Sequence, residues 1–135
     1  MIKLSKMTDY AVVILADMAC QKGMMSAAAL AESTKLPEPT VSKVLKLLTK
    51  QNIITSTRGT NGGYALIKPA DQINMAHVIV AVDGPIALTA CVDEGSDCCD
   101  RAGHCSMKGQ WNPVNMAMQS ALENVSLAQM MGSVK

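Results

Sequence analysis

Aromatic side chains are scarce in this chain of 135 residues, which has one Trp, two Tyr and no Phe. Their scarcity excludes a core built on the packing of large rings. Met, of which there are 11, and Ala must fill much of the interior instead. Because Met packs adaptably and specifies a core weakly, we expect a helical protein that gains stability from a partner subunit.

Long apolar runs are also missing from the sequence. No stretch is long enough to cross a membrane, and the first residues lack the apolar segment of a signal peptide. We therefore expect a cytoplasmic protein, in a compartment where disulfides are rare. Five cysteines in such a chain indicate metal binding or redox chemistry rather than a disulfide framework.

The net charge of +1 conceals an uneven distribution. Residues 1–69 contain nine Lys or Arg against four Asp or Glu, whereas residues 70–135 contain three against seven. A basic half joined to an acidic half suggests that the first half meets a polyanion. Ordinary surface variation is the alternative explanation.

The hydrophobic periodicity predicts a mainly α protein with a small β-hairpin. Helices are expected over residues 8–22, 26–33, about 39–51 and 74–83. A long helix, with one turn before Pro113, is expected to follow residue 105 and to run to about residue 125, and a short last helix should follow residue 126. The expected N-caps are Thr8, Ser26, Asn74 and Ser126. Two β-rich stretches at 53–58 and 64–67 flank a glycine-rich turn. Three helices followed by a hairpin is the order of a winged helix-turn-helix.

The third predicted helix has a buried stripe and a basic face. Apolar residues at 41, 44, 45 and 48 follow the spacing of a buried stripe. The opposite side is basic and rich in hydroxyl groups, and its candidate DNA contacts are Thr40, Ser42, Lys43 and Lys46. The lysines could contact phosphates or guanine edges, and the hydroxyls phosphates or bases. A plain solvated helix face would show the same residues.

The predicted hairpin strengthens the case for DNA. Arg58 stands at its tip, beside glycines that allow the backbone to approach a ligand closely. An Arg in that position can enter a narrow minor groove. The candidate contacts of this wing are Arg58, Gly59, Gly62 and Gly63.

Four of the five cysteines lie within fifteen residues of a polar segment, at Cys91, Cys98, Cys99 and Cys105. Three thiolates hold an iron–sulfur cluster if a fourth ligand comes from elsewhere, and the candidates are the adjacent His104 and the distant Asp9. A thiol–disulfide switch ranks next, and zinc ranks last because no C-x-x-C pair is present. Cys20 lies within the first predicted helix among apolar neighbours, so we expect it to be a buried free thiol.

The last long helix carries an apolar seam that is close to a heptad pattern. The seam consists of Trp111, Val114, Met118, Ala121, Leu122 and Val125. Such a surface is too apolar for a free helix, so we expect it to bury against a second copy of the chain in a homodimer.

Three segments resemble the IscR- and NsrR-type winged-helix iron–sulfur regulators: Ile2-Lys3-Leu4-Ser5-Lys6, Arg58 to Tyr64, and Val82-Asp83-Gly84-Pro85-Ile86 before Cys91. The likeness covers nearly the whole chain. It implies a homodimer whose affinity for operator DNA is set by a [2Fe–2S] or [4Fe–4S] cluster held by three cysteines. The opening segment is most similar to the regulators of SUF-type iron–sulfur assembly operons.

The cysteine spacing departs from that family's pattern, in which five residues separate successive ligands. Five residues separate Cys99 from Cys105, but seven separate Cys91 from Cys99. We expect Cys91, Cys99 and Cys105 to be the ligands, with Cys98 as the alternative to Cys99. The resemblance favours Asp9 of the partner subunit as the fourth ligand, ahead of His104.

The sequence therefore predicts four regions: a DNA-binding winged helix-turn-helix over 1–69, a connecting helix and extended segment over 70–90, a cluster-binding loop over 91–105, and a dimerisation helix with a short terminal helix over 106–135. An iron–sulfur electron carrier is a rival function, but it requires neither a basic helix nor an arginine wing. A cysteine enzyme would require an oriented base, for which only His104 beside Cys105 is available, so we expect no enzyme.

Overall fold

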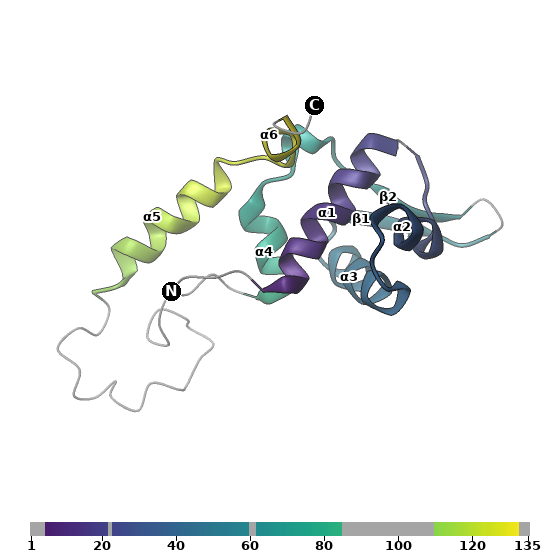
Figure 1. The fold of residues 1–135 in the computed structure, drawn as a ribbon. Coiled ribbons are helices and arrows are strands. Elements are labelled where there is room, and N and C mark those ends of the chain that lie inside the picture. Colours follow the sequence, from purple (N-terminus) through teal and green to yellow (C-terminus); the bar gives the residue numbers. More distant parts are fainter. Residues whose placement is uncertain (1–4, 22, 60–61, 85–109, 133–135) are drawn as a thin grey trace.

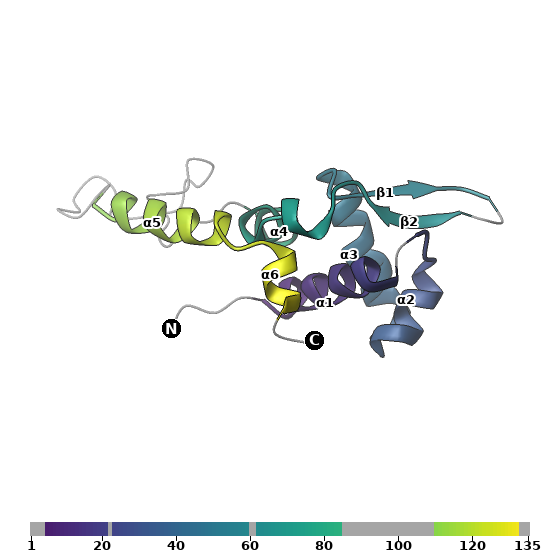
Figure 2. The ribbon, with the colours of Figure 1, turned by 90° about the horizontal axis from the view of Figure 1, so that it is seen from above.

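A computed structural model describes residues 5–21, 23–59, 62–84 and 110–132 of the chain. The helices and strands are α1 (Lys6–Gln21), α2 (Ala27–Thr34), α3 (Glu38–Lys50), β1 (Ile54–Thr57), β2 (Gly63–Leu66), the short 3-10 helix η1 (Ala70–Gln72), α4 (Met75–Asp83), α5 (Asn112–Glu123) and α6 (Leu127–Gly132). The hairpin and α5 extend from opposite ends of a helical body (Figures 1 and 2). The prediction of a mainly α fold with one small hairpin is confirmed.

Helix α1 is the centre of the body, in contact with α2, α3, α4 and α6. Its inward residues recur at three- and four-residue intervals and are almost fully buried: Ala11, Ile14, Leu15 and Met18. They pack with the stripe of α3, which consists of Val41, Val44, Leu45 and Leu48. Aliphatic side chains and Met fill this core, as the shortage of aromatic residues requires.

Three of the four predicted helix caps are confirmed. The side chains of Ser26, Asn74 and Ser126 accept hydrogen bonds from the backbone N–H groups three residues ahead, at 3.1, 2.8 and 3.1 Å. The prediction for the first helix is wrong, because α1 begins two residues earlier than expected. Ser5 caps the helix instead, since its Oγ accepts a hydrogen bond from the N–H of Thr8 at 3.2 Å.

The strands β1 and β2 form an antiparallel pair with Ile54 opposite Leu66 and Thr57 opposite Gly63. Ile54 is buried at the base of the hairpin, and the rest of β1 is exposed. One further residue joins the pair: Met25, in the connection between α1 and α2, bridges to Tyr64. Its N–H donates to the Tyr64 carbonyl at 2.9 Å, and the Tyr64 N–H donates to the Met25 carbonyl at 2.7 Å.

Helix α5 lies largely outside the body, and the chain then returns to it (Figure 1). The return is fixed by two backbone hydrogen bonds, from Met75 N–H to the Val125 carbonyl at 2.9 Å and from Leu127 N–H to the Ile73 carbonyl at 2.7 Å. Leu127 is fully buried, so α6 closes the core against α1 and η1. Among the helices of the described ranges, none has the length and apolarity that a membrane crossing needs.

Candidate nucleic-acid interface

Helices α2 and α3 are joined by a tight turn. Lys35 ends α2 in a left-handed conformation, with φ 62°. Pro37 then precedes α3 with a φ of −60°, and Pro39 occupies its first turn, where a missing N–H removes no hydrogen bond. Two short helices joined in this way form a helix-turn-helix, with α3 as the second helix.

Helix α3 separates an apolar side from a basic side. The apolar stripe is fully buried, whereas Lys43, Lys46 and Lys50 are exposed. Thr40 and Ser42 flank the lysines and are half-buried. The single acidic residue of α3, Glu38, lies in the first turn, where the helix dipole favours a negative charge. The predicted contacts therefore share one face, and that face carries no carboxylate beyond the first turn.

The tip of the hairpin carries the predicted arginine. Arg58 and Gly59 are exposed directly after β1, and Gly59 has a φ of 119°. The N–H of Gly62 donates to the Gly59 carbonyl at 3.0 Å, which closes the turn. A Cβ atom at Gly62 would lie 2.2 Å from the Thr57 carbonyl oxygen, so the turn has no room for a side chain there.

The hairpin is anchored to the helix-turn-helix through main-chain atoms. The bridge between Met25 and Tyr64 lies one residue before Ser26, the N-cap of α2. Gly63 has a φ of 149°, and a Cβ atom there would lie 2.7 Å from the Met25 carbonyl oxygen. Gly63 is thus explained by a close approach of two segments, and it fixes the hairpin beside α2.

Most of the predicted cluster ligands are outside the described part of the chain: Cys91, Cys98, Cys99, His104 and Cys105. The extended segment predicted at the end of the 70–90 region is also outside it, since the description of that region stops at Gly84. Asp9 is described, and it is exposed in the first turn of α1. Within the described ranges, no group of three or more Cys, His, Asp or Glu residues is arranged to hold a metal ion.

Beside Asp9, the structure has a polar cluster that sequence analysis missed. The carboxylate of Asp83, the last residue of α4, accepts hydrogen bonds from the Ser5 hydroxyl at 2.7 and 2.9 Å. It also accepts a hydrogen bond from the Thr8 hydroxyl, and Thr8 is only 1% exposed. One signal was available in the sequence: an acidic residue at the C-terminal end of a helix opposes the helix dipole and requires donors from elsewhere.

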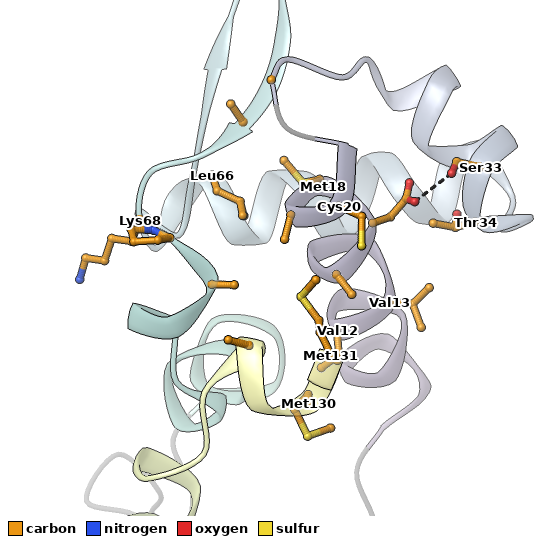
Figure 3. Close-up of a pocket in the computed structure, with 18 of the residues that line it drawn as sticks. Val12, Val13, Met18, Cys20, Ser33, Thr34, Leu66, Lys68, Met130 and Met131 are labelled. Carbon is orange, nitrogen blue, oxygen red and sulfur yellow. Dashed lines mark hydrogen bonds between the residues drawn. The ribbon is translucent and has the colours of Figure 1, made fainter. Parts of the chain in front are cut away.

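Cys20 is exposed, so the prediction of a buried thiol is wrong. It lies on the edge of an apolar groove of about 1180 Å³ between α1, the end of α2, the end of β2 and α6 (Figure 3). In this groove one oxygen of Asp17 accepts a hydrogen bond from the Ser33 hydroxyl at 2.9 Å, which ties α1 to α2. The helical pattern placed Cys20 on the first helix correctly, but the groove leaves that side of the helix open.

Helix α5 has an exposed apolar surface. Trp111, Val114 and Met116 are all exposed, and Met118 is half-buried. Only the C-terminal end of the seam, at Leu122 and Val125, packs against the core. At the other end of the seam, Trp111 and Val114 are exposed in the described part of one chain.

The chain is similar to known proteins both in sequence and in structure. The model of the Rrf2 family, described as an iron-dependent transcriptional regulator, matches residues 4–133. The regulator NsrR of Oceanobacillus iheyensis is 31% identical over 126 residues, which are 92% of this chain and 86% of the relative. IscR of Sodalis glossinidius is 28% identical over 133 residues, which are 97% of this chain and 79% of the relative.

Among solved structures, that of CymR, the global cysteine regulator of B. subtilis, has the same fold with a TM-score of 0.73. The match has 23% sequence identity and covers 98% of each chain. The arrangement of α1 to α3 with the hairpin is therefore the winged helix that the order of elements predicted.

Proposed function

Because this chain belongs to the Rrf2 family of transcriptional regulators, we propose that it binds operator DNA as a homodimer and that a bound iron–sulfur cluster sets its affinity for that DNA. Proteins of this family regulate transcription and are not enzymes. By its resemblance to SUF-type regulators, its proposed targets are genes for iron–sulfur cluster assembly. A regulator of such genes acts where the DNA is, in the cytoplasm.

The observation that carries the DNA-binding proposal is the pairing of two exposed basic elements on one rigid frame. The face of α3 with Lys43 and Lys46 is free of acidic groups beyond its first turn, and the Met25–Tyr64 bridge holds the Arg58 hairpin beside the helix-turn-helix. In the proposed complex α3 enters the major groove, and the hairpin reaches the minor groove. Thr40 and Ser42 lie beside the lysines, within the same footprint.

The homodimer is proposed from the uncovered part of α5. A helix that exposes Trp111, Val114 and Met116 presents an apolar surface that a second copy can bury. A twofold axis through α5 would set two winged helices on half-sites about 34 Å apart, one turn of DNA.

The donor set fits an iron–sulfur cluster. Thiolates are the usual ligands of such clusters, and Cys91, Cys99 and Cys105 supply three, with Cys98 as the alternative to Cys99. Asp9 is exposed on the first turn of α1, so its carboxylate is accessible to a partner subunit. His104 is the local alternative for the fourth position. Because a carboxylate binds iron–sulfur centres less firmly than a thiolate, a bound cluster would supply a labile, and hence responsive, centre.

A thiol-redox regulator without a cluster is the second candidate. It uses the same segment of four cysteines as a dithiol–disulfide pair. The observation in its favour is that CymR of Staphylococcus aureus, which has the same fold with a TM-score of 0.67, has been solved in an oxidized form. An iron–sulfur electron carrier is disfavoured, since it needs neither the lysine face nor the wing.

The test begins with protein purified without oxygen. We expect visible absorption, stoichiometric iron and sulfide, and an operator affinity that differs about 5–150-fold between the cluster-bound and apo forms, the usual range of allosteric coupling. Cys91→Ala, Cys99→Ala and Cys105→Ala should each abolish the absorption, whereas Cys20→Ala, the matched control on α1, should retain it.

Each contrary result selects a different function. Operator binding without absorption would favour the thiol regulator, and absorption without operator binding would favour the carrier. Equal operator affinities of the cluster-bound and apo forms would refute control by the cluster. Full absorption after Cys99→Ala would transfer the ligand role to Cys98.

A further inference from the structure

The Asp83 clamp, formed by Asp83, Ser5 and Thr8, joins the end of α4 to the start of α1. Both oxygens of the Asp83 carboxylate accept from the Ser5 hydroxyl, and one also accepts from the Thr8 hydroxyl. The Ser5 oxygen in turn caps α1 through the N–H of Thr8. Because Thr8 is 1% exposed, its hydroxyl depends on this carboxylate rather than on water.

The charge of Asp83 explains why the clamp acts across two helices. A carboxylate at the last residue of α4 faces the negative end of that helix, which is unfavourable. The same carboxylate stands at the positive end of α1, which is favourable. Hydrogen bonds to an ionised group are also stronger than neutral ones. Asp83 is therefore held by α1 and not by its own helix.

The clamp stands where residues of the two proposed cluster sites of the dimer come close along one chain. Gly84, with a φ of 87°, ends α4 directly after Asp83, and Cys91 follows as the eighth residue beyond Asp83. On the other side, Asp9, the proposed ligand to the cluster of the partner subunit, is the residue next to Thr8. Both the cysteine segment and the proposed carboxylate ligand are thus attached to residues of the clamp or to their neighbours.

From the clamp, α1 leads to the DNA-binding elements. The buried side of α1 packs against α2 and α3, and the Asp17–Ser33 hydrogen bond ties the far end of α1 to α2. A tilt of α1 therefore moves α2 and α3, because a close-packed core transmits displacement.

We propose that Asp83 is a positioning residue that couples the cysteine segment to α1 and so to the DNA-binding face of α3. This inference rests on the proposed control of operator affinity by a cluster. Asp83 binds neither the cluster nor DNA in this account. It determines how far a change in the cysteine segment displaces α1.

The experiment measures the ratio of operator affinities between cluster-bound and apo protein in the full-length dimer. Asp83→Asn keeps the size of the side chain and removes the charge, and Thr8→Val removes only the buried hydroxyl. Asp71→Asn, at an exposed position of η1, is the matched control for loss of a carboxylate. Fluorescence anisotropy gives the two affinities, and visible absorption gives the cluster content of the same samples.

We expect Asp83→Asn and Thr8→Val to retain the absorption and to bring the affinity ratio down to within about twofold of unity, from the 5–150-fold range typical of allosteric coupling. Asp71→Asn should keep the wild-type ratio. A purely structural role would weaken both forms alike and leave the ratio unchanged. Hydrogen exchange at the Thr8 amide should also differ between the two forms in the wild type and not in Asp83→Asn.

Three outcomes would overturn the inference. The first is a wild-type ratio in both clamp variants with their absorption intact. The second is loss of absorption in Asp83→Asn while Thr8→Val keeps both its absorption and its ratio, which would make Asp83 a determinant of cluster binding. The third is equal operator affinity of the cluster-bound and apo forms of the unmutated protein. That result refutes the proposed function itself and is seen before any variant is made.

Discussion

Helices α3 and α5 are both amphipathic and nearly equal in length, with 13 and 12 residues, yet they bury opposite kinds of surface. Helix α3 buries its whole apolar stripe at 0% exposure and presents lysines to solvent. Helix α5 buries the polar Asn115 and leaves Val114 50% exposed and Met116 66% exposed. The apolar residues of α3 are part of the core, whereas apolar residues of α5 such as Val114 and Met116 remain exposed.

Amphipathicity alone therefore does not determine which surface a helix packs against. Helix α3 follows α2 closely, so its apolar stripe faces a core made by the same domain. Helix α5 extends away from the body at the end opposite the hairpin (Figure 2), and only its C-terminal residues return to the core. In the proposed dimer the exposed apolar residues of α5 pack against the partner, whereas those of α3 are already buried within the protomer.

The largest expected effect comes from placing a charge in the buried apolar stripe of α3. Leu45→Lys buries an ammonium group among Val41, Val44 and Leu48, at a cost of several kcal/mol. Because the free energy of unfolding of a small domain is only about 5–15 kcal/mol, we expect the variant to lose most of its folded structure. Circular dichroism should show loss of helix and of the cooperative melt. A cooperative melt at the wild-type temperature would show that α3 is not part of the core.

A lysine introduced into the apolar seam of α5 should leave the fold of the protomer intact. Met118→Lys places a charge in the proposed dimer seam, where a central residue contributes about 2 kcal/mol or more to association. We expect monomers with near-normal helix content and little operator binding, measured by sedimentation and anisotropy. Gln119→Lys is the control, since Gln119 is exposed and lies four residues before Glu123, with which a lysine can pair. A stable Met118→Lys dimer would place the interface elsewhere.

The smallest effects are expected on the solvent face of α3 and at the wing. Arg58→Ala should weaken operator binding by about 1–3 kcal/mol, and Lys43→Ala or Lys46→Ala should each lower the slope of log affinity against log salt by about one unit. Thermal stability should not change, because these side chains are exposed. Lys68→Ala, two residues beyond the end of β2 and away from the tip, is the matched control. Unchanged affinity and salt slope in all three variants would refute the proposed docking.

Local features were predictable from the sequence. The caps at Ser26, Asn74 and Ser126 depend on residues three positions apart, and the stripe of α3 depends on one helical period. The hairpin was marked by its glycines. The basic side of α3 followed from the same period, since the residues that are not buried must face outward.

Features that depend on distant segments were not predictable. The start of α1 was misplaced because Ser5 acts together with Asp83, which is 78 residues away. Cys20 was expected to be buried because its neighbours in sequence are apolar, but the groove beside it depends on β2 and α6. The bridge from Met25 to Tyr64 is also long-range, and neither residue type marks it.

That bridge bears on how regulators of this shape can diverge. The spacing between α3 and the hairpin is set by main-chain hydrogen bonds and by the absence of a side chain at Gly63. It therefore does not depend on the identities of the residues that are proposed to contact DNA. Substitutions on α3 or at Arg58 can therefore change which operator is preferred while the distance between the two contact points stays the same. A single methyl group at Gly63 would do the reverse, shifting that distance without changing any residue that is proposed to contact DNA.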